Sequence, residues 1–568
     1  MKKLSYLTLL AAASVSMTGC IEETVPLTNI VTSDQAAQAP GSFENFVNSL
    51  VTPTIGQPYY GGASNINSFP YDFGYPATFL ERDVMGQDIV ITNSGSHLQT
   101  WAYCGTGLGP RYAVAQVPIT YYYGWIKNCN NLLNLVDEEN LPESQRHGVG
   151  QAYAMRALFY EDVARMYAET TYTLDPQAPT APIITEKTTP AEATNNPRAT
   201  NEKMWAFILD DLDKAEGYLS DYKRTDKTTI DLSVVYGLKA RAYLTMGLWS
   251  DAERYAKLAQ EGYTMLTSEQ YTDRNTGFNT ANNNSWMFAG KFKAEDPCIQ
   301  LNDADSSWGS LVALEITDQS ACGYASNYGY PLAIDYHLYQ TIPASDIRRK
   351  CFVDFSIAET YTEKGEPTNS TVAFAADYSD YPTTLALTNI GSNETGYGIG
   401  GASLKFRVAG GEEGHNNQYI GFLMDVPYMR VEEMMLIEAE AAGMQQESRG
   451  IQLLTQFATA RDPEYVYGMH NEAYGNTSTS AFQNEVWWQR RVELWGEGQA
   501  TFDIKRLNKG IIRSYEGTNH IADYRWNTTT PPQWMTLCFV NTEAQYNLAL
   551  VNNPTPLMPS ADSPVFVW

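Results

Sequence analysis

The segment from 233 to 262 most constrains the fold, because it contains two short amphipathic helices joined by a single turn. Its sequence is SVVYGLKARAYLTMGLWSDAERYAKLAQEG. Alanines recur along both halves at helical spacing, at positions 240, 242, 252, 256 and 259. Small side chains allow two helices to approach closely, and Gly247 suits the turn between them, with Trp249 opening the second helix. The segment therefore predicts a close-packed helix pair.

A pair of this kind resembles a tetratricopeptide unit, and one such unit cannot bury its apolar face alone, so several must stack. Further amphipathic helices are predicted at 118–136, 143–167, 201–219, 428–443 and 447–460. Together they predict a mainly α fold on a tetratricopeptide-like α-solenoid scaffold of about three or four pairs. The scaffold would occupy about 118–262 and 428–461. Unrelated helices in an ordinary α domain are the alternative.

The first twenty residues have the pattern of a bacterial lipoprotein signal. Two lysines precede an apolar run over 4–15 that is too short to span a membrane as a helix. Small residues then lead to Cys20, the position where such signals are cut and acylated. We expect a signal peptide over 1–19, lipidation of Cys20 and a tether over 20–42. An ordinary signal peptide with an incidental cysteine is the alternative.

Charge and cysteine usage narrow the classes of ligand and cofactor. The formal net charge is −27, so the surface would repel phosphate backbones, and we expect no nucleic-acid partner. Six cysteines beyond Cys20 are widely scattered, which permits disulfides without fixing their connectivity. They form no zinc-type spacing, and the six histidines form none either. The sequence therefore predicts no metal and no cofactor.

Two regions, about 50–115 and 265–427, are rich in Gly, Asn, Ser, Tyr and Pro and read as loops. Long loops are usually functional. Sugars need flat aromatic side chains for their C–H faces and amide or charged side chains for their hydroxyls. We therefore predict a ligand-binding half here, with packing in the core as the alternative for each ring. The candidate ligand-binding residues are Trp101, Trp286, Trp308, Tyr71, Tyr75 and Tyr328.

The sequence contains no recognisable catalytic constellation. Its 65 acidic residues guarantee chance carboxylate pairs, and the separation that defines a glycosidase pair is not encoded in sequence. The neighbouring acids Asp210 and Asp211, and Glu432 and Glu433, are interpreted as solvated helix faces. We predict no catalytic residue and no enzymatic activity.

Four segments taken together resemble the SusD-like (RagB/SusD) family of outer-membrane nutrient-binding lipoproteins. They are the signal ending at Cys20, GQAYAMRALFYEDVARMYAE at 150–169, YMRVEEMMLIEAEAAG at 428–443 and RRVELWGEGQATFDIKRLNKG at 490–510. The last is the most specific, and we interpret 487–510 as a structural motif. Its first charged residues are expected to open a helix and the later ones to form a buried ion network.

The resemblance implies one SusD-like domain over 43–568, with the irregular ligand-binding half laid over the solenoid. It also implies an outer-membrane location, lipid-anchored and surface-exposed. The implied partner is a TonB-dependent (SusC-like) barrel to which the chain delivers captured oligosaccharide. Two alternatives from other classes are a peptide-binding lipoprotein of a peptide importer and a glycoside hydrolase. The sequence does not name the glycan.

Overall fold

The structure is a computed structural model that describes residues 41–57, 71–300, 307–316, 323–327, 331–356, 370–373, 384–387, 400–470, 479–559 and 563–568. The predicted signal peptide, Cys20 and Tyr328 lie outside these residues. The described chain is mainly α, with three two-stranded antiparallel sheets. No helix in the described part is long and apolar enough to cross a membrane.

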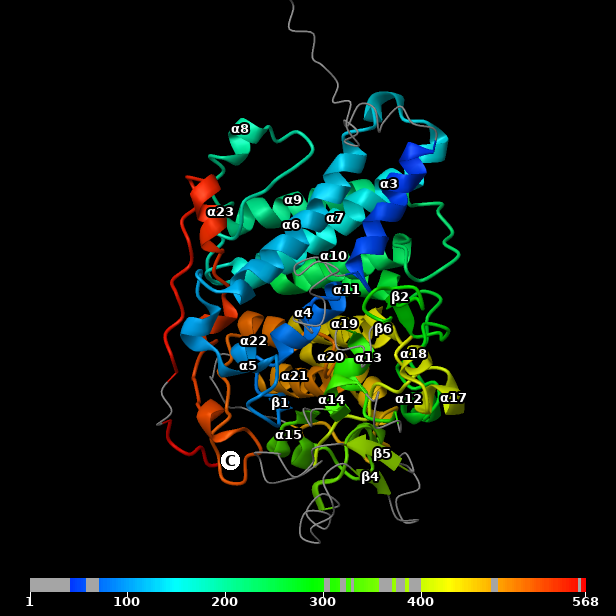
Figure 1. Ribbon diagram of the computed structural model, residues 1–568, viewed down its shortest axis with the longest axis vertical. Helices are drawn as coiled ribbons and strands as arrows, with labels where there is room; N and C mark the ends of the chain where they lie inside the picture. Colours follow the sequence, from blue (N-terminus) through cyan, green and yellow to red (C-terminus); the bar gives the residue numbers. More distant parts are fainter. Residues whose placement is uncertain are drawn as a thin grey trace, which may run out of the picture.

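The predicted solenoid is present and runs diagonally through the molecule (Figure 1). Its helices are α6 Ala113–Leu133, α7 Arg146–Tyr167, α9 Asn201–Tyr218, α10 Leu232–Met246, α11 Trp249–Ala259, α19 Val431–Gln445 and α20 Glu447–Thr459. Helix α7 packs between α6 and α9, α10 packs on α11, and α11 packs on α19, which in turn packs on α20. The tetratricopeptide-like, mainly α scaffold is thus confirmed.

Two glycine positions show how the sequence permits this packing. Gly247 has a φ of +69°, a left-handed conformation that side chains disfavour, and α11 begins two residues later at Trp249 as predicted. Between α19 and α20, a Cβ on Gly450 would lie 2.3 Å from the Cα of Gly443. Any side chain at Gly450 would therefore force the two helices apart.

Shorter elements surround the solenoid, most of them below it and a few beside its upper part (Figure 1). The helices are α3 Ser42–Val51, α4 Tyr75–Asp83, α5 Gln99–Tyr103, α8 Pro190–Ala193, α12 Ser268–Thr272, α13 Trp308–Val312, α14 Tyr324–Asn327, α15 Tyr336–Thr341, α17 Gly411–His415, α18 Gln418–Gly421, α21 Ala481–Glu493, α22 Ala500–Arg506 and α23 Asn541–Tyr546. The strand pairs are β1 Ile89–Ile91 with β3 Leu332–Ile334, β2 Trp286–Lys291 with β6 Asp425–Arg430, and β4 Ser370–Ala373 with β5 Thr384–Leu387. Strand β6 runs directly into α19, so the β2–β6 ribbon joins the loop-rich region to the solenoid.

Buried ion pairs tie neighbouring solenoid helices together. The Arg156 guanidinium on α7 makes two 2.8 Å bonds to Asp211 on α9. Arg241 on α10 pairs with Glu433 on α19 at 2.6 and 2.8 Å. The interpretation of Asp211, Glu432 and Glu433 as solvated residues is therefore wrong, because all three are buried. All three acids are buried for the same reason: a helix covered by neighbours on several sides has no solvated face.

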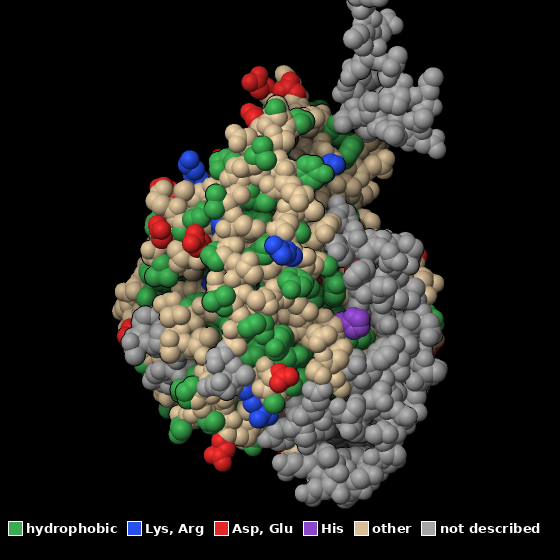
Figure 2. All heavy atoms as spheres, turned by 60° about the vertical axis from the view of Figure 1, so that its left-hand side comes forward, with side chains coloured by type: hydrophobic (Ala, Val, Ile, Leu, Met, Phe, Trp, Pro, Cys, Tyr) green, Lys and Arg blue, Asp and Glu red, His purple; other side chains and the backbone are tan. Residues whose placement is uncertain are grey.

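Beyond α23, the C-terminal segment runs along the edge of the solenoid as an extended strap from 547 to 559 (Figure 1). Asn553 fastens it by donating to the carbonyls of Tyr167 and Leu537 at 2.9 and 2.8 Å. Several of its apolar side chains stay exposed, among them Leu548 at 81% and Val551 at 76%. Figure 2 shows the face that carries this strap, with apolar side chains scattered over it.

Candidate ligand-binding site

The aromatic residues predicted to contact a ligand lie in the core of this structure. Trp101, Trp286 and Trp308 are all buried. Trp308 packs edge-on against Phe406 with ring centres 5.0 Å apart. Trp286 contacts Phe278 with ring centres 6.3 Å apart.

Two of the predicted tyrosines, Tyr71 and Tyr75, are also buried. Tyr71 packs edge-on against Trp101 with ring centres 5.0 Å apart, and the buried Tyr75 hydroxyl donates to Asp162 at 3.0 Å. The structure thus places these two tyrosines and the three tryptophans, predicted to contact a ligand, in the core. A ring enclosed by other side chains offers no free face to a sugar. Tyr328 lies outside the described residues.

A different set of residues forms a surface groove of about 790 Å³ next to β2. Three connecting segments line it: the α9–α10 connector at 220–231, the end of α11 through residue 263, and the turn at 281–284 before β2. Lys291, at the end of β2, closes one side. The groove thus lies where three successive connecting segments meet.

Three tyrosines line this groove and remain partly exposed, unlike the predicted rings. They are Tyr222, Tyr236 and Tyr263. The Tyr263 hydroxyl is fixed by Arg224, which donates to it at 2.5 Å, and lies 2.9 Å from the Ser233 hydroxyl. Tyr236 rests against Tyr255 with ring centres 5.8 Å apart. The groove therefore has aromatic surface held in defined positions.

Another part of the lining is a polar turn built around Asn283. Its side-chain oxygen accepts from the backbone amides of Ser285 and Trp286 at 2.8 and 2.9 Å. Its amide nitrogen donates to the Thr280 carbonyl at 2.8 Å. With Asn283 occupied in holding the turn, the neighbouring Asn282 and Asn284 are exposed and line the groove. Side-chain amides both donate and accept, as hydroxyl-rich ligands require.

Charged residues in the groove are mostly paired. Arg224 pairs with Asp231 at 2.9 Å, and Lys291 pairs with Asp226 at 2.6 Å. Lys227 donates to the Asn283 carbonyl. Burial, followed by the nearby charges of Arg224 and Lys291, lowers the pKa of Lys227 to about 8. Asp226 and Asp231 are thus each paired with a basic side chain, an arrangement that suits a ligand-binding site.

A buried carboxylate holds two of the groove segments in register. Glu432, the second residue of α19, accepts from the Ser285 hydroxyl and from the Leu266 amide, the latter at 2.8 Å. Ser285 follows the asparagine turn, and the backbone amide of Thr264 donates to the Asn284 carbonyl at 3.0 Å. The turn and the segment after α11 are therefore both fastened to the start of α19.

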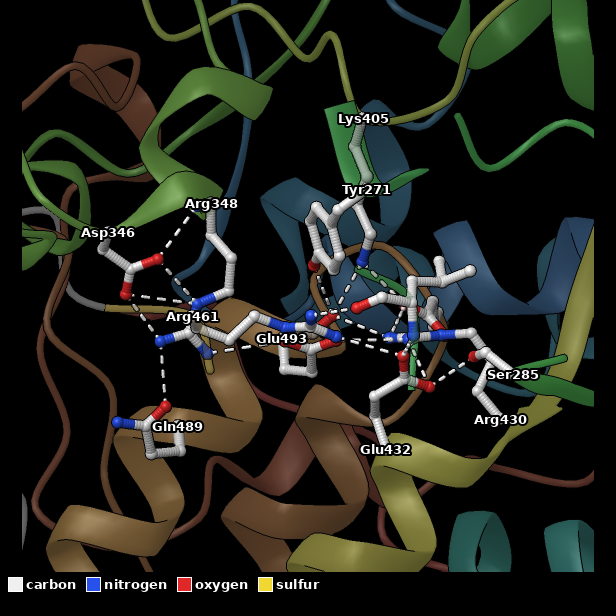
Figure 3. Close-up of polar contacts among 12 residues, drawn as sticks. Tyr271, Ser285, Asp346, Arg348, Lys405, Arg430, Glu432, Arg461, Gln489 and Glu493 are labelled. Carbon is white, nitrogen blue, oxygen red and sulfur yellow. Dashed lines mark hydrogen bonds and ion pairs between the residues drawn. The ribbon is translucent and has the colours of Figure 1, made fainter. Parts of the chain in front are cut away.

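Glu432 belongs to a larger buried ion network that also contains the C-terminal motif (Figure 3). The Glu493 carboxylate lies 3.0 Å from Arg461, 3.1 Å from Arg430 and 3.5 Å from Arg348. Burial alone would raise the pKa of Glu493, but these arginines hold it well below its usual range. Glu432 shares two of the arginines, Arg430 and Arg461, at 3.0 Å each.

The motif at 487–510 is structural in this fold, with one correction to its predicted layout. Arg490, Arg491 and Glu493 lie in the last turn of α21 and so close that helix. The predicted ion network is present for Asp503, which accepts from Arg490 and from Arg506, both at 2.7 Å. Lys505, predicted to belong to it, donates instead to the Arg165 carbonyl at 2.6 Å.

The five described cysteines beyond the signal, at 104, 129, 298, 351 and 538, are buried and free of disulfides. No cluster of three or more metal-ligating side chains occurs among the described residues.

Comparison with known proteins gives the family. A family model described as "Starch-binding associating with outer membrane" matches residues 92–244, and the model of the SusD family matches residues 262–554. Among the curated proteins, none matches this chain. A SusD-like carbohydrate binding protein from Bacteroides vulgatus shares the fold with a TM-score of 0.65 and 21% identity, covering 90% of this chain and 97% of its own.

Two further solved structures are similar over nearly their full length. A laminarin binding SusD-like protein has a TM-score of 0.59 and 17% identity, covering 90% of this chain and 99% of its own. Surface glycan-binding protein A from Bacteroides thetaiotaomicron has a TM-score of 0.58 and 15% identity, with 91% and 99% covered. Since the SusD model alone spans more than half of the sequence, this chain belongs to the SusD family.

Proposed function

We propose that this chain is a non-catalytic glycan-binding lipoprotein of the outer membrane. It captures oligosaccharide at the cell surface and delivers it to a TonB-dependent transporter. The observation that carries the proposal is the match of the SusD family model over 262–554 in a chain whose surface groove combines tyrosine rings with a turn of asparagines. The relatives named for laminarin and surface-glycan binding support the same class of ligand.

The groove is the proposed glycan site. Its volume of about 790 Å³ lies in the usual range of small-molecule sites. Tyr236 and Tyr263 supply ring surface for the apolar face of a sugar, while Asn282 and Asn284 supply donors and acceptors for its hydroxyls. Ring contacts and polar contacts in one groove would together hold a sugar.

Delivery rests on the predicted anchor and on the family. A lipid on Cys20, followed by the tether over 20–42, would keep the domain at the membrane while leaving it free to move. The proposed partner is a SusC-like barrel. Co-purification of the full-length chain from membranes with such a barrel tests this part separately from ligand binding.

The first experiment measures binding and breakdown together. The domain from residue 41 onward is run on affinity gels and in calorimetry against a panel of polysaccharides and peptides, and each mixture is checked for released product. Binding of one glycan class without product supports the proposal. Binding of peptides alone favours a peptide importer, and product release abolished by a single carboxylate substitution favours a hydrolase.

Two variants test the site. Tyr236→Ala removes ring surface from the groove and should weaken glycan binding roughly tenfold, the size expected for a stacking anchor. Tyr112→Ala removes an equally large, exposed tyrosine outside the groove and should leave affinity unchanged. Equal affinity for both variants and the parent protein would exclude the groove as the glycan site.

A further inference from the structure

The groove contains one half-buried cation without a carboxylate partner among the described residues. Lys227 lies in the α9–α10 connector, and the hydrogen bond found for its ammonium is to the carbonyl oxygen of Asn283. An ammonium has three N–H donors. Two of them are therefore available to a ligand in the groove.

The neighbouring charges do not neutralise Lys227. Asp226, the nearest acid in the chain, is already paired with Lys291 at 2.6 Å, and Asp231 is paired with Arg224 at 2.9 Å. Each of these two ion pairs has no net charge. Two lining charges remain outside them at the exposed rim, Lys223 and Glu261, and they offset each other. The uncompensated charge inside the groove is thus positive.

This local positive charge lies in a chain with a net charge of −27. The remote acids act on a bound ligand only weakly, because salt screens charges beyond about 8 Å at physiological ionic strength. A half-buried pair is screened much less. The groove can therefore favour an anion locally although the molecule as a whole is acidic.

We propose that the groove selects glycans that carry anionic groups, with Lys227 binding the carboxylate of a uronic acid or a sulfate ester on the sugar. The inference rests on the proposed glycan binding and adds its chemical class. Asn282 and Asn284, on the turn that Lys227 contacts, would bind the adjoining hydroxyls. Tyr263, fixed by Arg224, would lie against the ring of the same sugar.

The test compares polysaccharides that differ only in charge. A uronate polymer such as polygalacturonate is measured before and after chemical reduction of its carboxylates to alcohols, and dextran sulfate is measured against dextran. Polyglutamate serves as an anionic polymer that is not a sugar. Comparing the affinities for the two charged glycans shows whether the groove prefers a carboxylate or a sulfate. The inference expects a charged glycan to bind at least tenfold more tightly than its neutral match, and polyglutamate to bind weakly.

Lys227→Met is the matched variant, because it keeps the length of the side chain and removes the charge. It should lower affinity for the charged glycan roughly ten- to hundredfold, as expected for loss of a hydrogen bond to a charged group, and leave the neutral glycan unaffected. Lys203→Met is the control. Lys203 is exposed in the first turn of α9, at the end of this helix opposite to the groove and about 22 Å along its axis.

The outcomes separate the two proposals. Tighter binding of the charged glycan, lost in Lys227→Met and kept in Lys203→Met, supports the inference. Equal binding of charged and neutral glycans overturns it while glycan binding stands. Charge preference that survives Lys227→Met overturns the role of this lysine. Binding to no glycan, or to polyglutamate as tightly as to the charged glycans, overturns the proposed function as well.

Discussion

Replacing Glu493 by Gln should destabilise the whole domain, because Glu493 balances a buried network of charges. The network contains four bases, Arg348, Lys405, Arg430 and Arg461, and four acids, Asp346, Glu432, Glu493 and Glu497. All eight side chains are buried, and the set is electrically neutral. Glu493→Gln leaves the shape nearly unchanged but gives the buried set a net charge of +1.

The size of the effect follows from burial. Breaking a buried ion pair by removing one partner costs about 3–5 kcal/mol, because the remaining charge is buried without compensation. Glu493 contacts three arginines, at 3.0, 3.1 and 3.5 Å, so the upper part of that range applies. We expect the free energy of unfolding to fall by about 4 kcal/mol.

Urea unfolding, followed by tryptophan fluorescence and circular dichroism, measures this loss as a shift of the midpoint at unchanged slope. The control is Asp210→Asn. Asp210 is an exposed acid on α9 that pairs at 3.0 Å with Lys214, one turn further along α9. Exposed pairs of this spacing contribute about 0.3–0.5 kcal/mol. A loss below 1 kcal/mol in Glu493→Gln, comparable to the control, would refute the argument that this network holds the fold.

The pH dependence gives a second check. The arginines hold the folded-state pKa of Glu493 well below its unfolded value of about 4.3. Its stabilisation is therefore fully present above that unfolded value and is lost as pH falls through the folded one. The gap in stability between the parent protein and Glu493→Gln should be constant from pH 5 to 8 and narrow in acid. A gap that widened in acid would contradict the assigned shift.

Four other perturbations have defined outcomes. Glu432→Gln should lower stability like Glu493→Gln but also weaken glycan binding in calorimetry, since Glu432 holds Ser285 and Leu266 beside the groove; equal affinity in both variants would contradict this. Binding of an anionic glycan should weaken as pH rises from 7 to 9.5, because Lys227, with its pKa of about 8, loses the charge that attracts the ligand. An affinity that did not change over this pH range would exclude Lys227 as the group that binds the anion. Trp308→Ala should cost about 3–5 kcal/mol of stability as a core truncation, visible in urea unfolding; a small loss with a large affinity change would restore its predicted ligand role. Cys20→Ala should release the protein from the membrane fraction; persistent fractionation with membranes would argue against lipidation.

The solenoid could be predicted because its signal is local. The alanines around Gly247 and the position of Trp249 indicate a helix pair within thirty residues. The structure contains the predicted turn at Gly247. Helices with one covered face follow the 3.6-residue period, so their apolar stripes can be read without knowing their partners. The same argument located α7, α9 and α19 to within a few residues.

Predicting burial of charged residues failed for the opposite reason. Glu432 and Glu433 stand at the start of a helix whose pattern alone suggests one solvated side. In the structure β6, α10 and the segment after α11 cover that side, and each acid meets an arginine from another segment: Glu433 pairs with Arg241, 192 residues earlier, and Glu432 pairs with Arg461, 29 residues later. Neither pairing leaves a local trace in the pattern of the helix itself.

The groove was not predicted from the sequence, because the composition of a loop does not reveal which rings it exposes. Trp286 and Trp308 are flanked by Asn, Ser and Gly, the neighbours that a sugar site also requires, yet they anchor these loops in the core. Of the tyrosines in the groove, Tyr236 lies on α10, where an aromatic residue is usually read as core, and Tyr222 and Tyr263 lie in the connectors that follow α9 and α11. The asparagine turn at 282–284 was the usable signal, since it forms one lining of the groove.

The position of the groove has a physical rationale in the network beneath it. Its lining comes from connectors, whose side chains can change without disturbing a packed helix. Those connectors are fastened by Glu432 at the start of α19, inside the charge-balanced cluster of Glu493 and its arginines. A rigid buried anchor under variable side chains allows the ligand to change while the geometry of the groove is kept. Ligand class should therefore depend on residues such as Lys227 and Asn282, and the fold on the network.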